Sequence, residues 1–225
     1  NIINSVREKR MVNIQSDLRI RLAAITVDRL KVTTAGDAFQ ELQRCATHYH
    51  EKFGGQDISQ VPGVQYARQL FRELGIEPTR YRPASEALLR RALKNLPFYS
   101  INNLVDICNF CALDFLLPNG VYDLQKLMGR ITLRRGRIGE EYLGHTGQAV
   151  HLEGRYTLAD EIGPFGSPIT DSIRAAVSLQ TTKALIIVYA PLTYPEANLE
   201  VQLAIFGERL ATFCYAEDME KLIIN

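Results

Sequence analysis

The segment Ser100–Asp123, SINNLVDICNFCALDFLLPNGVYD, combines an apolar helical pattern with a turn and an aromatic–acid pair. At about 100° per residue, one broad face of this helix is apolar and carries Ile101, Leu104, Val105, Cys108, Cys111, Ala112 and Phe115. Asn102, Asp106 and Asn109 form a polar row on the opposite side. A buried polar group without a partner costs roughly 1–3 kcal/mol. We therefore expect this row either to hydrogen-bond nearby backbone groups or to contact a ligand.

Periodic apolar patterns predict further elements on both sides of this helix. Helices are expected from Asp37 (as the cap) to about Phe53, over 64–74, from Pro83 or Ser85 onward, and from Pro195 onward. Strands are expected over 18–27, 131–135, 141–143, 149–158 and 184–188. The order lacks the regular strand–helix alternation that a parallel sheet requires, so the sequence predicts an α+β fold.

Few residues suggest a metal or a cofactor. Cys108 and Cys111 form a CxxC pair, but both fall on the apolar face of the helix, and a zinc site would need two more ligands. We interpret them as packing thiols. The segment 163–168 is rich in Gly and Pro but lacks the Gly-Lys-Ser/Thr ending of a phosphate-binding loop. The expected cofactor and metal content is therefore none.

Charge and hydropathy also narrow the function classes. No apolar stretch approaches the ~20 residues that span a bilayer, and no signal pattern occurs at the beginning, so we expect no membrane association and a cytoplasmic location. The net charge of +1 gives no global attraction to nucleic acid. Basic side chains nevertheless gather in two clusters that could bind RNA phosphates: Arg80, Arg82, Arg90, Arg91 and Lys94, and Arg134, Arg135 and Arg137. Solvated helix and strand faces are the alternative interpretation.

Several separate motifs carry a family resemblance. They are Ile101-Asn102-Asn103-Leu104-Val105-Asp106-x-x-Asn109, Leu117-Pro118, Tyr122-Asp123-Leu124, Ala159–Pro168, and Thr181-Thr182 before the apolar run Ala184–Tyr189. Upstream, Pro62-Gly63-Val64 and Tyr81–Leu88 add to the pattern. Their order and spacing resemble the B3/B4 domain of the bacterial phenylalanyl-tRNA synthetase beta subunit, in the free-standing form found outside the synthetase. The resemblance covers roughly residues 60–190, and we expect residues 1–225 to form a single B3/B4-like domain.

The resemblance implies a β-sandwich-like core flanked by helices. In the synthetase this domain hydrolyses the ester bond that joins mischarged tyrosine to the tRNA for phenylalanine. The implied ligand-binding residues here are Asn102, Asp106, Asn109, Gly120, Gly163, Phe165, Gly166, Ser167, Thr170, Asp171 and Ile187. Two positions depart from the family pattern, since Gly120 stands where the synthetase has a His and Ile187 where it has a Glu. We expect one pocket between the polar row and residues 163–171, with Gly120 at its rim.

Three functions remain open from the sequence. The chain could interact with tRNA and hydrolyse mischarged aminoacyl-tRNA in trans, through residues that the sequence leaves unassigned. It could instead be a non-catalytic module that binds an amino acid or a small aromatic compound, or an RNA-binding or assembly protein without a small ligand. We expect no aminoacylation of tRNA, because 225 residues leave no room for an aminoacylation core. If both basic clusters face the same side, they would form one surface for tRNA.

Overall fold

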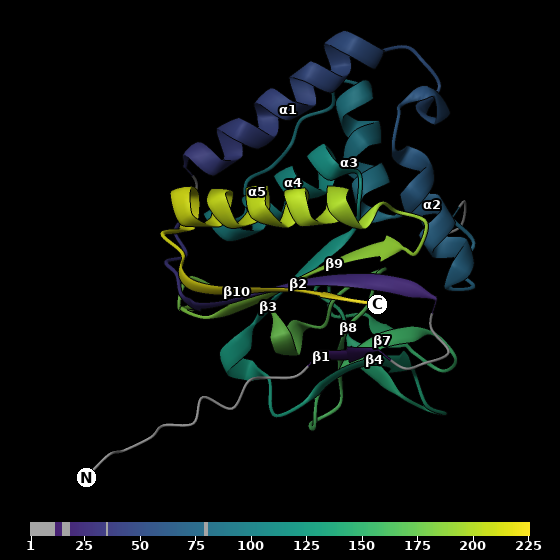
Figure 1. The fold of residues 1–225 in the computed structure, drawn as a ribbon, viewed down its shortest axis with the longest axis vertical. Coiled ribbons are helices and arrows are strands. Elements are labelled where there is room, and N and C mark those ends of the chain that lie inside the picture. Colours follow the sequence, from purple (N-terminus) through teal and green to yellow (C-terminus); the bar gives the residue numbers. More distant parts are fainter. Residues whose placement is uncertain (1–11, 15–18, 35, 79–80) are drawn as a thin grey trace.

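The computed structural model describes residues 12–14, 19–34, 36–78 and 81–225. Its central layer is a four-stranded sheet in the order β10-β2-β9-β3, and each neighbouring pair is antiparallel. The strands are β2 (Ile20–Arg29), β3 (Asn119–Asp123), β9 (Ala184–Pro191) and β10 (Glu217–Ile224). In Figure 1 this sheet crosses the middle of the molecule.

A second sheet, in the order β1-β4-β7-β8, lies below the central one in Figure 1. Its strands are β1 (Val12–Ile14), β4 (Ile131–Arg135), β7 (Tyr156–Ala159) and β8 (Pro164–Gly166), and β1 runs parallel to β4. The short strands β5 (Glu141–Leu143) and β6 (Ala149–His151) form a separate hairpin. The strands predicted over 131–135 and 141–143 are therefore present, and the one predicted over 149–158 is divided into β6 and β7.

Five α-helices are present in the described part of the chain: α1 (Asp37–Phe53), α2 (Val64–Glu73), α3 (Ala84–Leu93), α4 (Asn103–Phe115) and α5 (Glu196–Cys214). Short 3₁₀ turns occupy Ile58–Gln60, Leu124–Lys126 and Ile173–Ala175. Helices α4 and α5 cover the face of the central sheet that is turned away from the second sheet (Figure 1). No described helix is long and apolar enough to cross a membrane. The predicted α+β class is confirmed.

Strand β9 shows how the layers are built. Every residue of β9 is buried, because one face of the strand meets helices and the other meets the second sheet. Ile186 and Val188 pack with residues of α4 and α5, while Leu185 and Ile187 pack with residues of β4, β7 and β8. A strand covered on both faces needs a continuous apolar run instead of an alternating one. This explains the stretch ALIIVYA in the sequence.

Two local expectations need correction. Helix α1 begins with Asp37 as its first helical residue, and Gly36 occupies the capping position, where no side chain is available to bond the helix end. Ile101, placed on the apolar face of α4, lies before the helix and is 64% exposed. The predicted helical period begins two residues too early, because α4 starts at Asn103, after the capping residue Asn102.

Candidate functional site

The polar row at the start of α4 pairs largely within the protein. Asn102 caps the helix, and its Oδ1 accepts a hydrogen bond from the Val105 backbone N–H at 2.9 Å. Asp106 is buried and accepts hydrogen bonds from the Ser100 hydroxyl at 2.5 Å and the Ile101 N–H at 3.0 Å. Asn109 is half-buried further along the helix. Asn102 and Asp106 thus brace the segment that leads into α4.

The neighbouring residue, Asn103, lies outside the predicted polar row but makes the most extensive contacts. Its side chain is 2% exposed and makes three long-range hydrogen bonds. Oδ1 accepts from the Thr33 N–H at 2.8 Å, and Nδ2 donates to the carbonyl oxygens of Lys31 at 2.9 Å and Phe213 at 2.8 Å. Asn103 therefore ties α4 to the segment after β2 and to the end of α5. The pair of consecutive Asn residues in an apolar helix was the available signal.

A second group of polar side chains meets between the two sheets, around Tyr122 on β3. The Tyr122 hydroxyl donates to Asp171 Oδ1 at 2.6 Å and lies 3.4 Å from the Tyr189 hydroxyl of β9. The backbones of Gly120 and Gly166 lie directly against it, since a Cβ on either glycine would come within 2.8 or 2.6 Å of the Tyr122 Cζ atom. We call Gly120, Tyr122, Gly166, Asp171 and Tyr189 the Tyr122 cluster. It joins residues that are up to 69 positions apart, from 120 to 189.

Neighbouring predicted residues support this cluster. The Phe165 ring packs edge-on against Tyr122, with ring centroids 4.9 Å apart. Ile187 is fully buried and pairs with Gly120 in the register of β9 and β3. The two positions at which this chain departs from the synthetase pattern, Gly120 and Ile187, are therefore adjacent in space. Neither residue brings an ionisable group to the site.

The loop that carries Asp171 is held by short polar contacts. The Ser167 hydroxyl donates to the Thr170 carbonyl at 2.8 Å, and the Tyr142 hydroxyl donates to the same oxygen at 2.6 Å. The Ser167 backbone N–H donates to the Asp171 carboxyl group. The backbone N–H of Ser172, one residue later, donates to the Phe165 carbonyl oxygen at 2.9 Å. These bonds fix Asp171 against Tyr122.

The remaining predicted positions lie elsewhere. Gly163 belongs to the turn between β7 and β8, where its N–H donates to Asp160 and its carbonyl accepts from Arg174. By strand alternation Gly120, Tyr122 and Ile187 face the second sheet, whereas α4 packs on the other face of the central sheet. The structure thus brings Gly120, Gly166 and Asp171 together. Asn102 and Asp106 bond the segment that leads into α4, and the pocket expected between them and residues 163–171 stays a prediction.

The electrostatics of the Tyr122 cluster centre on Asp171. Burial raises the pKa of the Asp171 carboxyl to about 7, against the opposing effect of the hydrogen bonds from Tyr122 and Ser167. Burial also raises the pKa of the Tyr122 and Tyr189 hydroxyls, so both phenols stay neutral at physiological pH. Asp171 is therefore a carboxyl group that changes its charge near neutral pH.

The two basic clusters are separated. Helix α3 lies among the helices above the central sheet, whereas β4 belongs to the second sheet below it (Figure 1). The central sheet lies between the two segments, so the two clusters belong to different layers of the molecule. Arg80 lies outside the described residues.

Much of the basic charge is also paired within the protein. On the α3 side, the buried Glu86 accepts hydrogen bonds from Arg68 at 2.7 and 3.0 Å and from Arg90 at 3.0 Å, and Arg82 approaches it to 3.8 Å. On the β4 side, Arg134 makes a bidentate pair with Glu140 at 2.7 and 2.8 Å. Ion pairs reduce the net field that phosphate groups would meet.

Some cationic side chains lie over aromatic rings. Arg135 lies 4.6 Å from the ring centroid of Tyr156. Arg91 lies 5.8 Å from the ring centroid of Tyr99, a side chain that is 73% exposed. Lys94 and Arg137 are exposed. An exposed aromatic ring beside cations is the arrangement on which unpaired bases stack.

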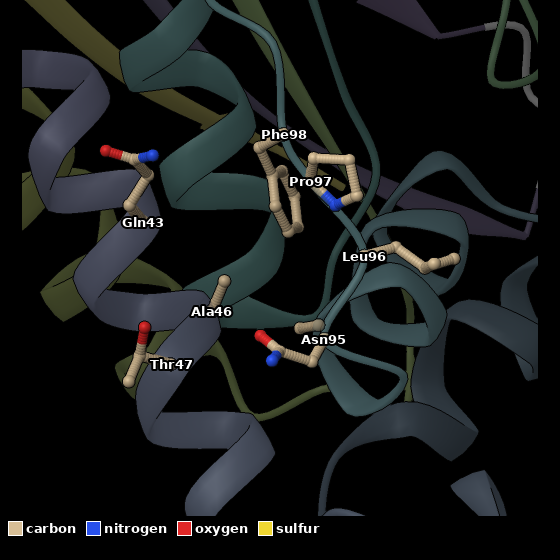
Figure 2. Close-up of a pocket in the computed structure, with 8 residues that line it drawn as sticks. Gln43, Ala46, Thr47, Asn95, Leu96, Pro97 and Phe98 are labelled. Carbon is tan, nitrogen blue, oxygen red and sulfur yellow. The ribbon is translucent and has the colours of Figure 1, made fainter.

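A pocket of about 230 Å³ opens between α1 and the loop after α3. Figure 2 shows its lining, with Gln43 and Thr47 on α1 and Asn95, Pro97 and Phe98 on the loop. A larger cleft of about 710 Å³ runs along the second sheet beside Arg130, Thr132 and Gly163. Neither contains a member of the Tyr122 cluster. The described residues hold no group of three His, Cys, Asp or Glu side chains that could bind a metal.

Comparison with known proteins places this arrangement in a family. The B3/4 domain family matches residues 66–193, a range that includes the whole Tyr122 cluster. The chain belongs to the B3/4 domain family. Its fold is similar to an N-terminal fragment of the phenylalanyl-tRNA synthetase beta subunit from Pyrococcus horikoshii, with a TM-score of 0.52 and 12% identity over 96% of this chain and 55% of that one. This likeness concerns the fold alone.

Curated relatives of this B3/4 domain chain are phenylalanine–tRNA ligase beta subunits. The protein of Brucella abortus (strain 2308) is 38% identical over 77 residues, which is 34% of this chain and 10% of that protein. The protein of Bradyrhizobium diazoefficiens is 33% identical over 109 residues, 48% of this chain and 13% of that protein. The chain thus matches about a tenth of the length of these relatives.

Proposed function

We propose that this B3/4 domain chain interacts with tRNA in the cytoplasm and hydrolyses the ester bond of mischarged aminoacyl-tRNA in trans. The observation that carries the proposal is the Tyr122 cluster, which lies within the matched region and presents one carboxyl group with a pKa of about 7. A group with a pKa near the working pH is suited to accept a proton from an attacking water. The glycines beside it let the Tyr122 ring pack directly against the backbone, which supports the position of the hydroxyl that bonds Asp171.

Hydrolysis is tested by incubating the protein with a panel of mischarged tRNAs and following loss of the ester bond. Asp171→Asn and Tyr122→Phe should slow the reaction at least tenfold, because the first removes the carboxyl group that accepts the proton and the second removes the hydroxyl that bonds it at 2.6 Å. Asp218→Asn is the matched control, since it makes the same chemical change on the exposed end strand. Equal rates for wild-type protein and Asp171→Asn would contradict the assignment. Ester loss at the background rate for every tRNA would contradict hydrolysis.

The tRNA contact is proposed for the α3 side, around Arg91, Lys94 and Tyr99. With about two phosphate contacts, binding should weaken with salt with a log–log slope of about −1.5. Changing Arg91 and Lys94 to Glu should abolish binding, while the same change at Arg135 and Arg137 should leave it intact. Arg90 is kept, because it pairs with Glu86. The reverse pattern would move the contact to the β4 side.

The alternative function is a non-catalytic module that binds an amino acid or a small aromatic compound. Gly120 and Ile187 favour it, because neither supplies an acid, a base or a phenol acceptor at positions where the synthetase pattern has His and Glu. Binding should then show no preference for tyrosine over phenylalanine. Calorimetry with both amino acids measures this preference, and a clear tyrosine preference would contradict the inferred role of Ile187. Ligand binding without ester hydrolysis would favour the module.

A further inference from the structure

The pocket of about 230 Å³ between α1 and the loop after α3 has an uncharged lining, and we call it the Asn95 pocket. Its lining combines two carboxamides, one hydroxyl and one aromatic ring, from Gln43, Asn95, Thr47 and Phe98. None of the described residues that line it carries a charge. Pockets for drug-sized ligands measure about 300–1,000 Å³, so this pocket suits a smaller, uncharged polar group.

The two walls of the Asn95 pocket are held in place by contacts between α1 and α3. His50 Nδ1 lies 3.1 Å from the Leu93 carbonyl oxygen, which ties α1 to the end of α3. Phe98 is half-buried and packs against the apolar cluster that includes Leu42 of α1 and Ala92 of α3. The core thus fixes the Phe98 ring while part of the ring remains exposed. A flat group can stack on a ring that is already in position.

Asn95 occupies a backbone position that glycine usually takes. Its φ is 50°, in the left-handed region, directly after Lys94, the residue that caps α3. The Asn95 N–H donates to the Ala92 carbonyl oxygen and the Leu96 N–H to the Arg91 carbonyl oxygen, both at 2.9 Å, which is the Schellman arrangement at a helix end. Asparagine keeps this turn and also supplies a carboxamide, which extends from the loop toward α1 in Figure 2. Glycine would form the same turn without lining the pocket.

Positive charge lies next to this uncharged pocket. Lys94 is exposed and precedes Asn95 in the chain, and Arg91 donates a hydrogen bond to the Pro97 carbonyl oxygen, which fixes its cation beside the loop. In RNA, flat uncharged bases alternate with negative phosphates, so one nucleotide matches both features at once. An apolar side chain of a protein partner would instead cover the carboxamides of Gln43 and Asn95 without bonding them, which is unfavourable.

We propose that the Asn95 pocket receives an unpaired base of a bound RNA, with an adjoining phosphate at Lys94. The base stacks on Phe98 and hydrogen-bonds the carboxamides. The proposal rests on the tRNA contact put forward for the α3 side and names what that contact recognises. Helix α1 lies before residues 66–193, so one wall of the pocket is outside the range that the B3/4 family matches. The pocket contains no member of the Tyr122 cluster, and the base needs no attached amino acid.

Fluorescence anisotropy with short labelled RNAs tests the proposal on the full chain. The probes are single-stranded RNAs, each rich in one of the four bases, and a duplex RNA of equal length. At least one single strand should bind about tenfold more tightly than the duplex, although the duplex carries more phosphates, because paired bases cannot enter the pocket. Equal or weaker binding of every single strand would overturn the proposal without depending on any variant.

Two variants then locate the base. Asn95→Gly keeps the left-handed backbone and removes the carboxamide, and Thr47→Val keeps the shape of the side chain and removes the hydroxyl. Each should weaken binding of the preferred single strand about two- to tenfold, the effect of one lost hydrogen bond, and leave duplex binding unchanged. Thr212→Val is the matched control, since it makes the same change at an exposed position of α5. Unchanged affinity of both Asn95→Gly and Thr47→Val, with wild-type stability in urea, would overturn the proposal.

The base pocket and the tRNA contact can fail separately, because the short RNAs need neither a tRNA fold nor an aminoacyl group. Single-strand binding that Asn95→Gly weakens, together with no binding of tRNA, would keep the pocket and remove the tRNA contact. Binding of tRNA that the Glu changes at Arg91 and Lys94 abolish, but that Asn95→Gly and Thr47→Val leave unchanged, would keep the tRNA contact and refute the base pocket.

Discussion

Replacing Asn103 by Ala is expected to destabilise the protein far more than the same change one residue earlier. Asn103→Ala removes the side-chain partners of the Thr33 N–H and of the Lys31 and Phe213 carbonyl oxygens, while the backbone bond from Asn103 N to Thr33 O at 3.0 Å remains. Each lost bond with a buried partner costs about 1 kcal/mol, so the total is about 3 kcal/mol. Asn102→Ala removes one capping bond and should cost about 1 kcal/mol.

The free energy of unfolding from urea titration measures this difference directly. For a chain of this size, about 1 kcal/mol lowers the melting temperature by roughly 2–4 °C. The melting temperature should therefore fall by about 6–12 °C for Asn103→Ala and by about 2–4 °C for Asn102→Ala. Asn103→Asp separates packing from hydrogen bonding. It has nearly the same size, but it cannot donate to the two carbonyl oxygens and places a negative charge against them.

Asn103→Asp should thus be at least as unstable as Asn103→Ala. A loss for Asn103→Ala no larger than that for Asn102→Ala would refute the reasoning. So would an Asn103→Asp variant with the stability of the wild type, since that would show that the two donated bonds contribute little.

Two other predictions follow from buried contacts. Gly120→Ala should lower the free energy of unfolding by about 1–3 kcal/mol, because the added Cβ overlaps the Tyr122 hydroxyl. Gly36→Ala is the control, because the space around its Cβ position is open and the loss of stability should be well below that of Gly120→Ala. Similar urea midpoints for the two variants would contradict the crowding at Gly120. Glu86→Gln should cost about 2 kcal/mol at neutral pH, because it leaves Arg68 and Arg90 without their carboxylate. Burial acts to raise the pKa of Glu86, but the hydrogen bonds from both Arg side chains outweigh it and hold the pKa below 4.5. The greater stability of the wild type over Glu86→Gln should therefore be present above pH 4.5 and disappear as the pH falls through the lowered pKa. A wild-type advantage that persists unchanged at lower pH would contradict this sign.

Helix positions could be predicted because each helix carries its own periodic pattern. The limits 37–53 match α1, and the stripe of Val64, Ala67 and Phe71 matches α2. Strand β10 could not be predicted from the stretch EDMEKLII, because its residues are largely exposed and it becomes a strand by pairing with β2. Edge strands depend on a partner that local sequence does not reveal.

The sequence by itself determined the α+β class, the helices and the family, since apolar periodicity and motif spacing are properties of neighbouring residues. It also pointed to Gly120, Gly166 and Asp171, through the resemblance. Only the tertiary structure decided how these residues are used. The sheet places Gly120 and Tyr122 on the face opposite α4, and the loop after β8 brings Asp171 to Tyr122. Such contacts join segments that are far apart in the chain, which is why local sequence patterns do not reveal them.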